Sequence, residues 1–393
     1  MVAGQDVSIT SPVPGTTTDV VEKVMELLPV GPVVFLDTGG MDDRSALGAK
    51  RIERTRKVFD RADVSVLILE ADEWTEFEED VARKAAARKS PLILVVNKGD
   101  IKAPSDSYLD VLKKRTSRIL VCSSTDHAHR NAYVNLLKQF LLDVCPEDFL
   151  KAPAMLGDII PKGGLAILII PIDFEAPKGR IILPQVQAIR DALDHDAMAL
   201  VVKESDYRTA LSKLKASPDL VVCDSQVVDR MVAETPAGTK CTTFSILLSR
   251  IKGNIAEMTK GALAIDKLQA GDRILISESC SHHAIDGDIG RIKIPKWIQE
   301  HLGHEVKVTV CAGRDFPDNL KEFKLIIQCG SCMLSRRETL ARIQHAKREG
   351  VPITNYGLCI SYLQGVLERV IEPFPEALEA LREARIGTKE VLS

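Results

Sequence analysis

The sequence predicts an α/β protein made of three consecutive α/β units, at residues 1–150, 164–255 and 258–393. Short continuous apolar runs alternate with amphipathic stretches along most of the chain. This pattern is typical of parallel strands whose sheets are covered by helices on both faces. The periodicity breaks at 145–163, where three prolines and a glycine pair indicate a linker. A chain of 393 residues is long enough for a full hydrophobic core in each unit.

In the first unit the expected strands are rich in Val, Ile and Leu and end in turn residues, whereas the expected helices are amphipathic. The strands are predicted at 32–40, 63–70, 91–100 and 118–124, and the helices at 45–62, 76–89, 105–116 and 130–143. A mostly parallel sheet follows from this alternation.

The second and third units repeat the alternation without close sequence similarity. In the second unit we expect strands at 164–173, 197–205 and 219–225 and helices at 183–196 and 206–218. In the third unit we expect strands at 272–280, 305–313, 322–330 and 351–357 and helices at 294–303 and 335–350. Ser335 and Glu338 form a capping box at the start of the last of these helices.

Composition limits the class of partner. Lysine and arginine number 52 and aspartate and glutamate 55, a net charge of −3, so no broad electrostatic attraction to nucleic acid or anionic lipid is expected. No apolar run approaches the roughly 20 residues of a membrane span, and the N-terminus does not resemble a secretion signal. We expect a soluble cytoplasmic protein with no nucleic-acid or membrane partner.

Nine cysteines without a secretion signal argue against a disulfide framework and leave packing, catalysis or metal binding. Most should be packing residues. Cys122, Cys223, Cys241 and Cys311 follow β-branched runs, where a small apolar side chain suits a buried position.

Two cysteine motifs stand at the ends of expected strands in the third unit. Cys280 with His282 follows one strand, and Cys329 with Cys332 follows another, 47 residues beyond His282. The carboxyl ends of parallel strands converge, so these motifs can meet. A zinc site, an iron–sulfur cluster with a weaker fourth position, and simple core cysteines all fit, zinc and iron–sulfur equally well.

The helix expected after Cys332 favours an anionic group beside it. The positive N-terminal end of a helix stabilises thiolate. Arg336 and Arg337 add charge of the same sign in its first turn.

Four motifs of the first unit indicate a GTPase fold, because they stand in the required order at strand ends. Threonine hydroxyls of "PGTTTD" suit Mg²⁺, as does the aspartate of "DTGG", whose last glycine suits the γ-phosphate. "NKGD" and "CSS" suit recognition of guanine. The candidate nucleotide-binding residues are Thr16, Thr17, Thr18, Asp37, Gly40, Asn97, Lys98, Asp100, Ser123 and Ser124. None is identified as catalytic.

The phosphate-binding motif G-x-x-x-x-G-K-[ST] occurs nowhere in the sequence. Without its backbone amides and lysine, the β- and γ-phosphates lose their main contacts. The first unit is therefore expected to be a truncated P-loop GTPase domain, from a chain that begins late rather than from a degenerate GTPase. Any GTP hydrolysis by this chain should be impaired.

The three units together resemble the HydF family, which comprises FeFe-hydrogenase H-cluster maturation GTPases and scaffolds with a TrmE/Era-like GTPase domain. The resemblance rests on "PGTTTD", "DTGG" and "NKGD", on "ILPQVQAIRDALD" in the middle unit, and on "CSHHAIDGDIGRIKIPKW" and "CGSC" in the last.

The resemblance implies a GTPase domain, a dimerisation domain and an iron–sulfur domain. It implies a 4Fe-4S cluster on Cys280, Cys329 and Cys332 with an exchangeable fourth site, and favours iron–sulfur over zinc. His282 matches the histidine of the C-x-H motif, and His282, an external ligand and a nearby carboxylate are the three alternatives for the fourth ligand. Gln328 stands where the family often has histidine. The implied cofactors also include GTP, Mg²⁺ and a monovalent cation such as K⁺. The implied partners are apo FeFe-hydrogenase, which receives a diiron precursor, the radical-SAM maturases, and further copies of the chain.

Two alternative functions remain. One is an interaction protein with a structural zinc site and a vestigial nucleotide-binding domain. The other is a ribosome-assembly GTPase, which would require a basic RNA-binding module after the first unit, whereas the acidic balance and the cysteine motifs argue against it.

Overall fold

The computed structural model describes residues 21–27, 31–38, 61–145, 153–172, 179–279, 288–313 and 315–390. The chain divides into two compact units, Met1–Ala152 and Pro153–Ser393. Within the described ranges, no helix combines the length and the apolar character needed to cross a membrane.

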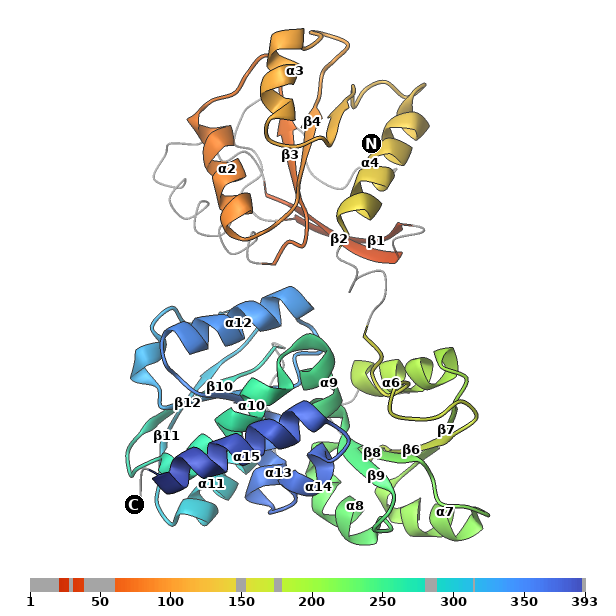
Figure 1. Ribbon diagram of the computed structural model, residues 1–393, viewed down its shortest axis with the longest axis vertical. Coiled ribbons are helices and arrows are strands. Elements are labelled where there is room, and N and C mark those ends of the chain that lie inside the picture. The colour runs from red at the N-terminus through yellow and green to blue at the C-terminus, as the bar shows by residue number, and fades with distance from the viewer. Residues whose placement is uncertain are drawn as a thin grey trace. The chain divides into compact units, whose positions relative to one another are not determined.

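The first unit is an α/β unit with two sheets (Figure 1). Strands β1 (Val21–Leu27) and β2 (Gly31–Asp37) form an antiparallel hairpin. Strands β3 (Ser65–Leu69), β4 (Leu92–Val96) and β5 (Ile119–Val121) form a parallel sheet in that order. The helices are α2 (Glu76–Ala87), α3 (Asp106–Lys113) and α4 (Arg130–Val144). The sequence predicted β2 to β5 and these helices, but not β1.

Strand β4 is buried on both faces, which explains its unbroken apolar sequence. Leu94 and Val96 join one core cluster, which includes Leu112 of α3. Ile93 and Val95 join another, with Leu137 of α4. The parallel sheet is therefore covered on both sides, as the sequence predicted.

The second unit contains two four-stranded parallel sheets of the same strand order. The first sheet has the order β7-β6-β8-β9, with β6 Leu165–Ile169, β7 Met198–Val202, β8 Leu220–Cys223 and β9 Lys240–Thr243. The second has the order β11-β10-β12-β13, with β10 Arg273–Ser277, β11 Lys307–Cys311, β12 Leu325–Gln328 and β13 Ile353–Asn355. The second and third α/β units predicted from the sequence both fall within this compact unit.

The helices of the second unit pack the two sheets into one continuous core (Figure 1). They are α6 Leu183–Asp194, α7 Tyr207–Lys213, α8 Val228–Glu234, α9 Phe244–Lys252, α10 Ile255–Ala262, α11 Ile294–Leu302, α12 Arg336–Arg348, α13 Tyr356–Leu363, α14 Leu367–Ile371 and α15 Pro375–Glu390. Leu168 of the first sheet and Ile276 of the second belong to the same buried cluster.

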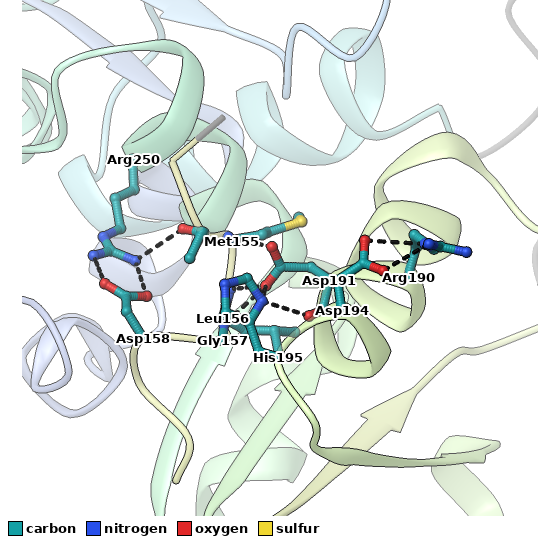
Figure 2. A network of polar contacts seen from close by, with 10 residues as sticks. Met155, Leu156, Gly157, Asp158, Arg190, Asp191, Asp194, His195 and Arg250 are labelled. Carbon is teal, nitrogen blue, oxygen red and sulfur yellow. Dashed lines mark hydrogen bonds and ion pairs between the residues drawn. The ribbon is translucent and has the colours of Figure 1, made fainter. Parts of the chain in front are cut away.

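Part of the expected linker is built into the second unit. Met155 and Leu156 are buried, and the Asp191 carboxylate accepts hydrogen bonds from the backbone N–H groups of Met155, Leu156 and Gly157 at 2.8–3.0 Å. Arg250 of α9 donates to Asp158 at 2.8 Å (Figure 2). Residues 155–158 are therefore held against the second unit, although they fall within the expected linker.

Three of the four expected packing cysteines are fully buried: Cys122, Cys223 and Cys241. Burial raises the pKa of Cys223 and raises that of Cys241 to about 11, so both thiols stay protonated and inert at neutral pH. Cys311 is only partly buried, at the end of β11.

Candidate functional site

The candidate metal-binding loop starts at the carboxyl end of β12. Ser277 of β10 pairs with Gln328 of β12, so the residues that follow both strands lie side by side. The Sγ of Cys329 is 3.1 Å from the backbone nitrogen of Ser279, which donates to it, and 2.9 Å from the Ser279 hydroxyl. Ser279 immediately precedes Cys280 in the sequence.

Hydrogen-bond donors surround the Cys329 sulfur. Burial raises the pKa of this thiol, whereas hydrogen bonds from the Ser279 side chain and from the backbone N–H groups of Ser331 and Ser279 lower it. Such donors stabilise a thiolate, the form of cysteine that binds metal. The donor set at Cys329 therefore fits a thiolate-bound metal centre.

The loop has a tight turn at Ser331, whose φ of +56° is uncommon for a residue with a side chain. Its hydroxyl donates to the carbonyl oxygen of Cys329 at 3.2 Å and accepts a hydrogen bond from the Gln328 amide. Serine thus links the two ends of the turn. The opposite side of the loop is held by Lys252, whose Nζ donates to the carbonyl oxygens of Ser331, Cys332 and Leu334.

Helix α12 begins just after the loop. The Ser335 hydroxyl accepts a hydrogen bond from the backbone N–H of Glu338 at 3.1 Å, so Ser335 is the N-cap that the sequence predicts. The positive end of this helix lies directly after the loop that carries Cys332.

Two of the four predicted metal ligands, Cys280 and His282, lie outside the described residues. Among the residues that are described, no group of three or more His, Cys, Asp or Glu side chains could hold a metal ion. The structure brings Cys329 next to the residue before Cys280, while the roles of all four ligands stay predictions.

Sequence reasoning missed a buried arginine behind the loop. Arg342 of α12 is 5% exposed and donates to the Ser277 hydroxyl at 3.0 Å and to the Gly313 carbonyl at 3.1 Å. Its guanidinium also lies over the Phe316 ring, 5.0 Å from the centroid. The helical spacing of α12 gives no signal that this particular arginine faces inward.

A second missed group lies on Tyr356 of α13. Its hydroxyl is buried and has no hydrogen-bond partner among the residues that the structure describes. Burial raises the pKa of Tyr356, and the negative charges that also raise it are those of Cys329, Glu278 and Asp288. The sequence marks the close approach of Tyr356 to the segment at residue 290 only through Gly290. A Cβ at that position would lie 2.0 Å from the Tyr356 hydroxyl oxygen.

The candidate guanine-binding edge lies at the carboxyl ends of β4 and β5. The Asn97 Oδ1 accepts the backbone N–H of Ser124 at 2.9 Å, and its Nδ2 donates to the Ser124 hydroxyl at 3.3 Å. The Gly99 N–H donates to the carbonyl of Cys122 at 3.0 Å. These contacts join the "NKGD" and "CSS" motifs, as expected for parallel neighbours.

The other predicted nucleotide residues are dispersed. Lys98 has a left-handed backbone with φ of +59° and forms an ion pair with Glu70. Asp100 is exposed, and the buried Ser123 shares a hydrogen bond with Thr125 at 2.8 Å. Asp37 ends β2 in the separate hairpin. Thr16, Thr17, Thr18 and Gly40 lie outside the described residues.

Three family models match the chain. Residues 1–98 match a 50S ribosome-binding GTPase model, 155–253 a hydrogen maturase F dimerization domain, and 256–373 a hydrogen maturase F tetramerization domain. The two hydrogen maturase F models together cover more than half of the chain.

Two curated relatives each match about a quarter of the chain. The tRNA modification GTPase MnmE of Synechococcus sp. (strain JA-3-3Ab) is 43% identical over 109 residues, which is 26% of this chain and 22% of the relative. GTPase Der of Thermomicrobium roseum is 36% identical over 106 residues, 25% of this chain and 23% of the relative. The chain thus spans less than a quarter of the length of these relatives.

Proposed function

Because the chain belongs to the hydrogen maturase F family, we propose that it is a scaffold for the maturation of FeFe-hydrogenase. It carries a 4Fe-4S cluster and a diiron precursor, and delivers the precursor to apo-hydrogenase. In a complete nucleotide site, binding and hydrolysis of GTP with Mg²⁺ in the first unit would regulate its conformation, and a monovalent cation such as K⁺ would assist there. The radical-SAM maturases are its further partners.

The observation that supports the cluster is the environment of Cys329. Cys329 is partly buried, and its sulfur accepts hydrogen bonds from Ser279 and Ser331, an arrangement that suits an anionic sulfur ligand. Cys280, Cys329 and Cys332 would hold the cluster, with His282 as the candidate for the fourth position. When bound, a cluster with three firm protein ligands offers one iron to an exogenous group, as a carrier requires.

The chain's own residues prepare this site. The N–H groups of Ser279 and Ser331 stabilise negative charge on the Cys329 sulfur. Arg342 adds a buried positive charge behind the strand ends. The loop is thus prepared for an anionic ligand before one arrives.

In the first unit, Asn97 and Asp100 would recognise guanine, and the Ser123–Ser124 segment would meet the base from β5. Asn97 is already oriented by its two hydrogen bonds to Ser124. Asp37, a threonine among Thr16, Thr17 and Thr18, and Gly40 would serve the metal and the γ-phosphate in a complete site. Nucleotide turnover would order and release loops of the first unit, and it would take no part in the chemistry of the iron–sulfur cluster.

Self-association would use an apolar face of the second unit. Apolar side chains on α6 and on β7, the edge strand of its sheet, are 42–59% exposed. They are Leu183, Val186, Leu193, Met198 and Val201. All five lie within the segment that matches the dimerization domain, so we assign this face to a second copy of the chain.

The test of the cluster is an electron paramagnetic resonance (EPR) spectrum of anaerobically reconstituted, dithionite-reduced protein. The wild type and a Cys145→Ser control should give the S = 1/2 signal of a 4Fe-4S cluster. A Cys329→Ser/Cys332→Ser double variant should lack it. One tightly held zinc per chain, persisting after reconstitution with iron and sulfide, would instead favour a structural zinc site and contradict the proposal.

A further inference from the structure

Lys252, the last residue of α9, lies against the cysteine loop. Its Nζ is 2.8 Å from the carbonyl oxygen of Cys332, 2.9 Å from that of Leu334 and 3.1 Å from that of Ser331. These three acceptors use the full donor capacity of an ammonium group. Among the described residues, Lys252 forms no ion pair with a carboxylate, so its bonding is directed at the loop.

The contact depends on the unusual shape of the loop. The left-handed turn at Ser331 lets three carbonyl groups of a short segment point toward one nitrogen. Without that nitrogen, these partly buried carbonyls would lose their hydrogen bonds, and the turn would lose its support. Leu248 of α9 packs beneath the same loop, since a Cβ on Gly330 would lie 3.3 Å from its Cδ1.

Helix α9 is itself held firmly at both ends. The Thr243 hydroxyl caps its start, and Ser245 accepts hydrogen bonds from the Asn355 side chain at 2.8 and 3.1 Å. Near its end, Arg250 is bound to Asp158. Lys252 is therefore held in place by a helix that is fixed at both ends.

We propose that Lys252 is a positioning residue that holds the Cys329–Cys332 loop in its metal-binding conformation and places a positive charge beside it. The lysine belongs to the segment that matches the dimerization domain, whereas the loop belongs to the segment that matches the tetramerization domain. A residue of the dimerization segment thus supports the candidate metal-binding loop of the tetramerization segment. The part of this inference that concerns the cluster rests on the proposed function.

The first test uses the full chain without metal. Lys252→Met keeps most of the side-chain length and removes the donors and the charge. Lys260→Met is the matched control, because Lys260 lies on the next helix and only forms a surface ion pair with Glu383. Hydrogen exchange of the backbone amides at residues 329–334 should be about tenfold faster in Lys252→Met than in the wild type or the control, because the loop loses three hydrogen bonds. Equal rates in all three proteins would overturn the inference.

The second test uses the reconstituted protein. Lys252→Met should release iron to a chelator about 10- to 100-fold faster, the usual effect of losing an outer-shell contact. It should also have a lower reduction potential, because a positive charge near the cluster has been removed. Lys252→Arg, which keeps the charge and several donors, should restore the potential and remains usable if Lys252→Met folds poorly. A potential unchanged in Lys252→Met would contradict the inference.

The two tests separate the inference from the proposed function. If the wild type holds no cluster, the proposed function fails, and the hydrogen-exchange rates still decide the role of Lys252. If the wild type holds a cluster but Lys252→Met matches Lys260→Met in every measurement, only the inference fails.

Discussion

A Cβ atom on Gly157 would lie 2.1 Å from the Cγ of His195. The imidazole cannot swing away freely, because its Nδ1 lies within hydrogen-bonding distance, 2.7 Å, of the Asp191 carbonyl oxygen, and the clashing atoms lie at the base of the ring. Gly157→Ala should therefore destabilise the second unit by about 1–3 kcal/mol, measured by urea unfolding.

The clash can be checked by removing the other partner. His195→Ala should recover most of the stability lost in Gly157→Ala, so the double variant should be more stable than the sum of the single effects predicts. Gly238→Ala is the matched control, because nothing lies within 4 Å of the added Cβ. Additive effects of the two substitutions would show that the contact does not constrain Gly157.

Asn97 should contribute to the stability of the first unit as well as to guanine recognition. Asn97→Ala removes both hydrogen bonds to Ser124 and should lower the free energy of unfolding of this unit by about 1–2 kcal/mol. The fluorescence of Trp74, measured in a Trp297→Phe background, reports on the first unit alone. Asn131→Ala, at an exposed position of α4, should have little effect.

Guanine nucleotide should bind this chain only weakly. The sequence contains no G-x-x-x-x-G-K-[ST] motif, so the amides and the lysine that bind the phosphates are missing from it. A titration with a fluorescent guanine nucleotide should give a Kd above the micromolar range, and Asp100→Ala should weaken the residual binding further. Sub-micromolar affinity would contradict this prediction.

The Asp158–Arg250 ion pair should make the second unit sensitive to acid. The hydrogen bond from Arg250, together with the charges of Arg250 and His195, holds the pKa of Asp158 below its ordinary range. A carboxylate with a lowered pKa in the folded state contributes stability above the unfolded pKa, and this contribution is lost as the pH falls through the folded value.

The wild type should therefore be more stable than Asp158→Asn at pH 7, by less than about 1 kcal/mol because the carboxylate is half exposed. The difference should shrink as the pH falls below about 4. Asp196→Asn, which breaks a fully surface ion pair with Lys162, should change stability little at any pH. A difference that grows toward acid pH would reverse the expected sign.

The apolar face on α6 and β7 should carry the association of two copies. Leu193→Glu with Met198→Glu places two charges where apolar contact is expected and should weaken association at least tenfold. Sedimentation velocity should show a smaller species at micromolar concentration. Ile101→Glu, at a still more exposed apolar residue of the first unit, should leave the mass unchanged. An unchanged mass in the double variant would assign the contact elsewhere.

Local pattern predicted most of the strands because they are buried on both faces. Strand β4 is an unbroken apolar run for that reason, and so is β6, in which Ala166–Ile169 are at most 1% exposed. Strand β1, "VEKVMEL", was missed because polar residues interrupt it at no regular period and only its pairing with β2 makes it a strand.

Several contacts of the candidate metal site that the sequence did not predict are long-range. Convergence of strand ends correctly brings Cys329 beside Ser279. Lys252 and Arg342 have the spacing of surface charges on amphipathic helices, but the partners described above are 29–82 residues away in the sequence. No local pattern encodes such a contact, and the same holds for Asp191, which binds Met155 from 36 residues away.

Leu168 and Ile276 belong to one hydrophobic core, so the stabilities of the two hydrogen maturase F segments are coupled. The two family models meet near residue 254, but the structure has no domain boundary there, since both segments lie in one compact unit. Heating should unfold both sheets in one cooperative transition. Cleavage of the chain at that boundary should leave two aggregation-prone fragments rather than two independently folded domains. A destabilising mutation in either segment would therefore shorten the lifetime of both, so self-association and metal binding would be lost at the same temperature.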